Sequence, residues 1–408
     1  MKVGELRPGM LLAQAVRDVN GRLLMGEGTC LTERFLGVLK AWGIAEVAVQ
    51  GEKTCSLADA GDGLPESLAA RAQEICAVRL SRCDLANPVV QDVFHLAVAR
   101  VGHLLEKGAP LVPPTLAKPG DEGSDLAPLD MEQLATEDLP MDAMPEVLAR
   151  LAQIMENPSA SPAEAADIIQ CDPGLAAKLL KMVNSPLYGF PQRIDTISRA
   201  VTIIGVQQLS ALALGVTVMG VFRSIPKNLL DTRQFWLHSL ACACGARALA
   251  SALGLPNTER YFVGGLLHDV GQLFFFLHVP ERARLVLAQV RATGESLQSA
   301  ERRCLGADHG QAGGTLLAAW QLPASLVQAA ACHHDPLAAP APQDATIVHV
   351  ADFIAEALHF GSNGQSVLAP LNTAALGMLH VPPGVAAQVA ARIEEQLGQL
   401  ESIFLGGS

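Results

Sequence analysis

The sequence is short of charged and of aromatic side chains. Charged residues make up 17% of its 408 residues, and Phe, Trp and Tyr together only 4%. Lys and Arg number 29 against 41 Asp and Glu, so the net charge is −12, and the cations form no basic cluster. Proteins that bind nucleic acid without sequence preference neutralise phosphates with clustered Lys and Arg. We therefore expect no nucleic-acid partner.

The sequence also lacks a disulfide framework, a secretion signal and a clear membrane span. Its nine cysteines are scattered and odd in number, which indicates reduced thiols. The start, MKVGELRPGMLL, has no long apolar core and no A-x-A site. Residues 201–222 are uncharged and long enough to cross a bilayer, but Gln207, Gln208 and Ser210 interrupt them and no second span exists. We expect a cytoplasmic protein without membrane contact, in which this segment is a buried helix or helix pair.

The first part of the chain shows strand patterns and then helical ones. Residues 1–52 alternate apolar and polar positions around the hairpin-turn pair Asn20-Gly21, which predicts a small β-rich N-terminal module. Residues 53–108 have helical periodicity and predict a helical connector. Residues 109–137 are rich in Pro, Gly and Asp and predict a linker.

The rest of the chain reads as helix after helix with short polar breaks. Ser161 before Pro162, for example, is an N-terminal capping signal. We predict a helical domain over residues 138–345 and C-terminal helices over residues 346–408 that pack on it. The fold class is therefore mainly α, with an all-helical domain preceded by the β-rich module and the connector.

One ionisable pair interrupts an apolar segment. In GLLHDVGQL, residues 265–273, His268 and Asp269 stand side by side where the sequence otherwise reads as core. Burying such groups is costly unless they are paired or bind something. Neighbours on a regular helix point about 100° apart, so they can serve one site only where the helix is interrupted. We expect Gly271 to permit that interruption.

Other segments supply candidate partners for this pair. Imidazoles and carboxylates together suit a divalent transition metal such as Fe, Mn, Zn or Ni. One site would use His238, His268, Asp269 and Asp352, and a second, bridged by Asp269, would use His309, His333 and His334. Two such ions can activate a water and hold a phosphoryl oxygen. Taken singly, each histidine is more often a satisfied or capping residue, and the two near a helix end would suit the helix dipole without any metal.

The segment NSPLYG offers a different kind of candidate. Asn184, Ser185 and Pro186 suit the end of one helix and the start of another. The functional alternative is a partner-binding surface formed by Asn184 and Ser185 with the loop aromatics Tyr188 and Phe190.

Five motifs, in this order, resemble the HDOD domain, the HD-related output domain of bacterial signalling proteins. They are DPGLAAKLLKMVNSPLYG (172–189), IDTISRAVTIIGVQQLSALAL (194–214), FWLHS (235–239), GLLHDVGQL (265–273) and AAWQLPASLVQAAACHHDP (318–336). The resemblance covers about residues 139–345 and lies within the HD superfamily of metal-dependent phosphohydrolases. Residues 3–50 are similar to a module found ahead of HD-GYP cyclic-di-GMP phosphodiesterases.

This chain departs from the HD-GYP enzyme pattern at two places, and both bear on the function that the resemblance implies. An HD-GYP enzyme would carry Lys where this chain has Gln272, and a GYP tripeptide where it continues LAAPAPQD after HHDP. HDOD domains are generally regarded as degenerate folds that signal through protein contacts. We therefore expect a regulatory protein that is not an enzyme and meets signalling partners in trans. The ligand set is kept, and metal binding, a nucleotide ligand and a homodimer are left open. The alternative is a metal-dependent phosphohydrolase of nucleotides or cyclic dinucleotides, in which Asp269 would be catalytic.

Overall fold

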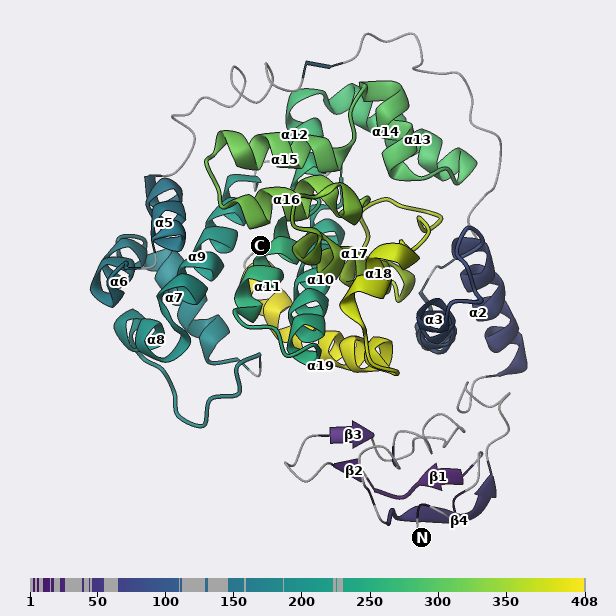
Figure 1. The fold of residues 1–408 in the computed structure, drawn as a ribbon. Coiled ribbons are helices and arrows are strands. Elements are labelled where there is room, and N and C mark those ends of the chain that lie inside the picture. The colour runs from purple at the N-terminus through teal and green to yellow at the C-terminus, as the bar shows by residue number, and fades with distance from the viewer. Residues whose placement is uncertain are drawn as a thin grey trace. The chain divides into compact units, whose positions relative to one another are not determined.

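Helices dominate the structure, which confirms the mainly α prediction (Figure 1). The computed structural model describes residues 65–109 and 146–406, apart from residues 158, 186, 223–224 and 226–229. It also describes short stretches within residues 3–54 and residues 111, 129 and 130. The chain divides into two compact units, one of residues 1–72 and 98–109 and one of residues 73–97 and 110–408.

The described part of the first unit contains short antiparallel strand pairs. Strand β1 (Met10–Leu12) pairs with β4 (Val49–Thr54), and β2 (Val16–Arg17) pairs with β3 (Leu23–Met25). The predicted turn Asn20-Gly21 and most of residues 1–52 lie outside the described residues. The β-rich module therefore stays a prediction.

The helices of the predicted connector contribute residues to both units, and a group of short capped helices follows them in the second unit. Asp172, for example, accepts hydrogen bonds from the backbone of Gly174 and Leu175, as its N-cap position requires. The helices α6 to α9 pack on one another, and α5 packs on α6 and α9. These elements are α2 (Glu66–Arg79), α3 (Pro88–Glu106), α5 (Glu146–Glu156), α6 (Pro162–Gln170), α7 (Pro173–Val183), α8 (Ile197–Ile204) and α9 (Val206–Val221).

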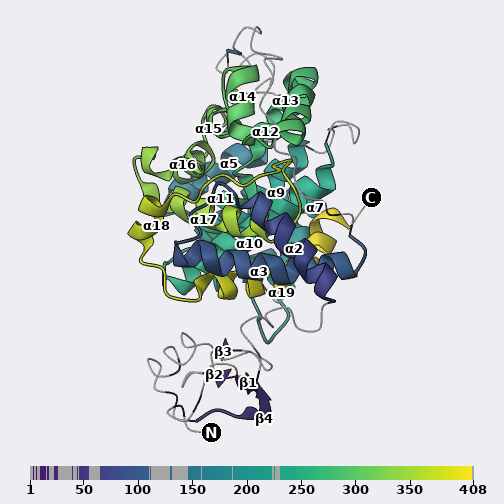
Figure 2. The ribbon, with the colours of Figure 1, turned by 90° about the vertical axis from the view of Figure 1, so that its right-hand side faces the viewer.

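A second group of helices includes the long, largely buried α10, and α12 to α15 lie at one end of it (Figure 2). Helix α10 packs on α11, α17 and α19, and α12 packs on α15. The members are α10 (Thr232–Ala252), α11 (Thr258–Leu267), α12 (Val270–His278), α13 (Pro280–Thr293), α14 (Leu297–Leu305), α15 (His309–Ala319), α16 (Ala324–Cys332), α17 (Pro342–Ala357), α18 (Thr373–Leu379) and α19 (Val385–Leu405).

The uncharged segment 201–222 is a helix pair, as predicted. Gly205, with a φ of +105°, separates the end of α8 from α9, a backbone conformation that side chains rarely adopt. Ten residues of α9 are buried among neighbouring helices. No helix in the described ranges combines the length and apolarity that a membrane crossing needs.

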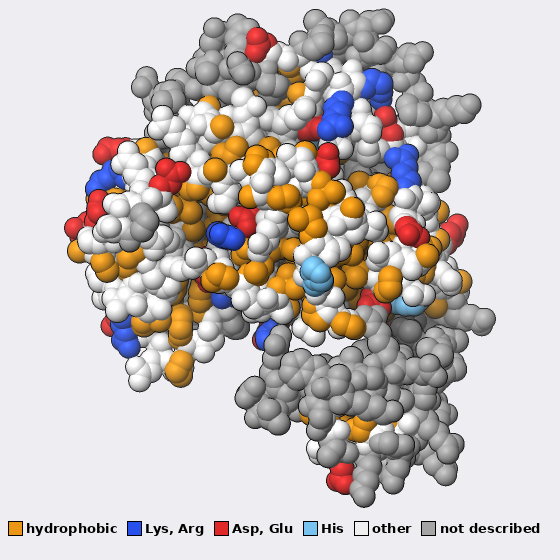
Figure 3. All heavy atoms as spheres, viewed as in Figure 1, with side chains coloured by type: hydrophobic (Ala, Val, Ile, Leu, Met, Phe, Trp, Pro, Cys, Tyr) orange, Lys and Arg blue, Asp and Glu red, His pale blue; other side chains and the backbone are white. Residues whose placement is uncertain are grey.

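The scarcity of charge is visible on the surface. On the face drawn in Figure 3, hydrophobic and uncharged side chains predominate, and the Lys and Arg side chains stand apart from one another.

Candidate metal centre

The helical conformation is interrupted at the His–Asp pair, between two helices. Helix α11 ends at Leu267 and α12 begins at Val270, so His268 and Asp269 occupy the junction. The break frees both side chains from helical spacing and lets them reach one place.

The reason predicted for this break was wrong. Gly271 lies inside α12 and is not among the glycines with positive φ. A Cβ at this position would collide with the carbonyl of His309 and come within 2.6 Å of the backbone nitrogen of Gly313. The missing side chain therefore lets α12 and α15 pack backbone against backbone, which carries His309 to Asp269.

Asp269 and Asp352 form the first half of a buried cluster with two histidines. The Nε2 atom of His238 is 3.5 Å from Asp269 Oδ2 and 3.1 Å from Asp352 Oδ1. The Nε2 atom of His268 is 3.2 Å and 3.4 Å from the same two oxygens. All four residues are buried, so the predicted first group lies in one place.

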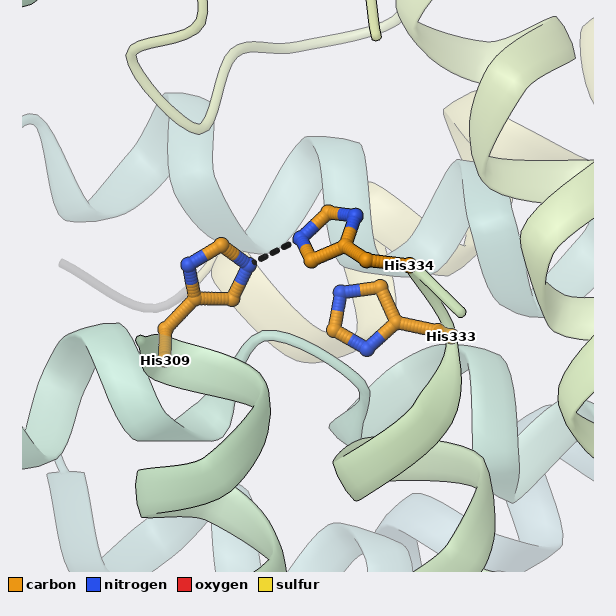
Figure 4. A group of neighbouring side chains, drawn as sticks. All are labelled: His309, His333 and His334. Atoms are coloured by element: carbon orange, nitrogen blue, oxygen red, sulfur yellow. Dashed lines mark hydrogen bonds between the residues drawn. The ribbon is translucent and has the colours of Figure 1, made fainter. Parts of the chain in front are cut away.

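The other oxygen of Asp269 faces the second half of the cluster. Asp269 Oδ1 is 3.2 Å from His309 Nε2 and 3.6 Å from His333 Nε2. The Nε2 atom of His334 lies 2.6 Å from His309 Nε2 (Figure 4). Figure 4 shows that His309 starts one helix and that His333 and His334 follow the end of another. The structure thus brings all seven predicted metal ligands together, with Asp269 between the two halves.

The outer ring nitrogens of three histidines are held by acceptors. Nδ1 of His268 lies 2.8 Å from the Gly265 carbonyl, and Nδ1 of His333 lies 2.7 Å from the Ala330 carbonyl. Nδ1 of His309 contacts the carboxylate of Glu301. Because Nδ1 donates its hydrogen to these acceptors, the Nε2 lone pair of the neutral ring points to the cluster, the arrangement typical of metal-ligating histidines.

The inner atoms of the cluster contact one another but lack hydrogen-bond partners. Five buried atoms that face one another form no hydrogen bond of proper geometry: Asp269 Oδ1, Asp352 Oδ1 and the Nε2 atoms of His238, His268 and His333. An unsatisfied buried polar group costs about 1–3 kcal/mol. Histidine nitrogens and carboxylate oxygens in this number suit a divalent transition metal ion, which would bind all of these atoms together.

Charge in the cluster shifts the pKa values of its members. Burial lowers the pKa of His238, but Asp269 and Asp352 outweigh burial and raise it to about 9. Burial raises the pKa of Asp269, but His268 and the other imidazoles outweigh it and hold that pKa well below its usual range. Without metal, His238 is therefore protonated at neutral pH and forms ion pairs with the two carboxylates.

This shift predicts how metal binding depends on pH. The metal-free pKa of His238, about 9, lies above its ordinary value, so binding at pH 7.5 must displace a proton. Metal affinity should rise with pH through this range, because His268 and His309, whose pKa values also lie well above the ordinary value, must lose protons as well. Calorimetry in buffers of different ionisation enthalpy should find proton release at pH 7.5 and less at pH 9.5. Equal proton release at both pH values would contradict this assignment.

Sequence reasoning missed several residues that contact the cluster. Cys242 and Glu356 each follow a predicted ligand by four residues on the same helix, so helical spacing could have found them. Burial raises the pKa of the Cys242 thiol to about 11, and this thiol donates to the Val348 carbonyl. No pattern indicated Asn363, whose amide donates to Asp269 Oδ2 at 3.1 Å.

The cluster opens on a very small cavity. Its lining includes His309, His334 and Asp352, and its volume is about 20 Å³. Such a volume holds about one water molecule. The backbone nitrogen of Leu297 donates to the Gln365 side chain at 2.7 Å, which joins two of the segments that line the cavity.

The connector helix α2 helps to hold one of these segments. The buried guanidinium of Arg79 donates to the backbone carbonyls of Glu356 at 3.1 Å and Ser366 at 3.3 Å. The backbone nitrogen of Leu368 donates to the Arg79 carbonyl at 2.8 Å. The chain around residue 366 is therefore tied to α2 as well as to α14.

The four residues of the predicted partner surface have different roles. Asn184 and Ser185 use their side chains within the loop: Asn184 donates to the Ile194 carbonyl at 2.7 Å, and Ser185 donates to the Met182 carbonyl at 2.6 Å. Tyr188 is half-buried with its hydroxyl enclosed, while Phe190 is exposed. Of the four, Phe190 alone is an exposed hydrophobic side chain.

Comparison with known proteins finds a family model that matches part of the chain. The HDOD domain model matches residues 141–336. A crystal structure of an HDOD domain protein of unknown function from Geobacter sulfurreducens is 26% identical, with a TM-score of 0.56, over 67% of this chain and 98% of that one. A candidate phosphohydrolase from Shewanella amazonensis shares the fold, at 24% identity and a TM-score of 0.53 over 69% of this chain and 100% of that one.

One curated relative matches at the sequence level. An uncharacterised protein from Treponema pallidum is 27% identical over 202 residues, which are 49% of this chain and 38% of that protein. The match therefore spans less than two fifths of the relative's length.

Proposed function

We propose, from the match of residues 141–336 to the HDOD domain model, that this chain is a signal-transduction protein that binds a divalent transition metal and acts through protein contacts. The metal ligands would be His238, His268, Asp269 and Asp352 in one group and His309, His333 and His334 in the other. The observation that supports metal binding is the set of five buried, unpartnered donor atoms that face one another.

Two observations favour protein contacts over hydrolysis. The cavity beside the cluster, about 20 Å³, admits a water but is far too small for a nucleotide, since ligand pockets usually measure about 300–1,000 Å³. Its lining contains no Lys or Arg. Gln272, in the position where HD-GYP enzymes carry Lys, is buried and its amide has no hydrogen-bond partner.

A metal-dependent phosphohydrolase is the second candidate. The observation that favours it is that Asp269 presents one oxygen to each group of histidines, as a bridging ligand would. Two ions held there would supply an activated water and positive charge for a phosphoryl oxygen. The Shewanella amazonensis neighbour is also described as a candidate phosphohydrolase.

Elemental analysis tests metal binding. Protein from metal-supplemented medium should carry about one or two Fe, Mn, Zn or Ni ions per chain, and the Asp269→Ala variant should lose them. His349→Gln is the matched control, because this neighbouring buried histidine already accepts the backbone N–H of Asn372 at 2.9 Å. Equal metal content in wild type and Asp269→Ala, or none in either, would overturn the proposal.

The same preparation separates the two candidates. Metal-loaded protein should not turn over cyclic dinucleotides or nucleoside phosphates. Turnover that disappears in Asp269→Ala and persists in His349→Gln would establish the phosphohydrolase instead.

A further inference from the structure

A wide groove lies between α7, within the residues that match the HDOD model, and α19, which follows them in the chain. Its volume is about 980 Å³, and its apolar lining consists of Ala177, Leu180, Phe190, Ile194 and Ile403. That volume is at the upper end of ligand pockets and contrasts with the small cavity at the metal centre. An open apolar groove between two helices suits a third helix laid into it.

The loop that forms one wall of the groove is firmly held. The Asn184 side chain donates to the carbonyls of Leu180 and Ile194, both at 2.7 Å, and accepts from the Ile194 backbone nitrogen at 2.8 Å. Phe190 stacks on Tyr188 with ring centroids 5.8 Å apart and an angle of 12° between the rings. Phe190 is nevertheless 36% exposed. It is therefore an aromatic anchor that is already in place before a partner arrives.

The charges of the groove set the chemistry of its occupant. Lys181 and Arg193 line it and are exposed, and neither forms an ion pair with another described residue. The one acidic lining residue, Asp195, faces Arg199 at 4.0 Å. In a chain with a net charge of −12, these two unpaired cations beside the apolar lining of the groove favour a partner that carries carboxylates.

We propose that this groove binds an acidic amphipathic helix of a partner protein. The apolar face of that helix contacts Phe190 and the other apolar lining residues, and its carboxylates pair with Lys181 and Arg193. The proposal rests on the signalling function above and names the surface and the partner chemistry for it.

Helical peptide libraries displayed on phage test the proposal on the full-length chain. Two libraries of about 15 residues would share an apolar face and carry either Glu or Lys on the polar face. The Glu library should yield binders, and their affinity should be measured by fluorescence anisotropy. Lys181→Glu/Arg193→Glu should weaken them at least about tenfold, and Phe190→Ala by a similar factor. Arg150→Glu/Arg291→Glu makes the same charge change at exposed sites on α5 and α13 and should leave affinity within about twofold.

Three results would overturn the proposal. The first is that binders come only from the Lys library, or from neither library. The second is binders whose affinity is the same for wild type and for Lys181→Glu/Arg193→Glu. The third is that sedimentation finds a wild-type dimer that dissociates in the Lys181→Glu/Arg193→Glu variant. The last result would assign the groove to a second copy of the chain. Metal content measured on the same variants should equal that of wild type, so failure here and failure of the metal centre are told apart.

Discussion

Replacing Gly271 with alanine is expected to destabilise the protein by about 3 kcal/mol or more, or to prevent folding. The added Cβ would meet the backbone of His309 and Gly313, and backbone cannot move aside as a flexible side chain can. Helices α12 and α15 would have to separate, which loses close packing along their contact and draws His309 away from Asp269. Urea unfolding of the purified variant measures the loss.

Gly398→Ala is the control for this change. Gly398 lies inside α19, and a Cβ there would meet nothing within 4 Å. Alanine has the higher helix propensity, so this variant should gain about 0.5–1 kcal/mol. Equal stability of the Gly271→Ala and Gly398→Ala variants would show that α12 and α15 do not depend on a side-chain-free contact.

Metal removal is expected to have the other large effect. Metal that binds the folded chain alone stabilises it by about 4 kcal/mol when its free concentration is a thousand times Kd. The gain should be large here because five inner donor atoms have no other partner. Unfolding midpoints would be compared for metal-loaded and chelator-treated protein.

Two variants decide whether the cluster causes that difference. Asp269→Ala removes the residue that faces both groups of histidines, so its unfolding midpoint should not change on chelation. His349→Gln should respond to chelation as wild type does, because burial already lowers the pKa of His349 to about 4 and this ring is not among the ligands. A chelation effect that persists in Asp269→Ala would place the stabilising metal elsewhere.

The surroundings of the His–Asp pair could be predicted from the sequence in part. The cost of burying charge was enough to predict that His268 and Asp269 lie with polar residues from distant segments, and ligand chemistry named histidines that the structure brings to the same place. Helical spacing could have added Cys242 and Glu356. Asn363 could not be found, because it lies in an irregular segment after α17 and reaches Asp269 through the fold.

By itself, the sequence determined the helical class of this chain, the break at residues 268–269 and the types of donor that share the cluster. These depend on local periodicity, helix caps and the chemistry of single side chains, all of which can be read along the chain. Only the tertiary structure decided that Gly271 is a contact between helices, that the cavity at the cluster measures about 20 Å³, and that an open groove lies between α7 and α19. Those features arise where segments far apart in sequence pack together, and packing distances are not encoded in any one segment.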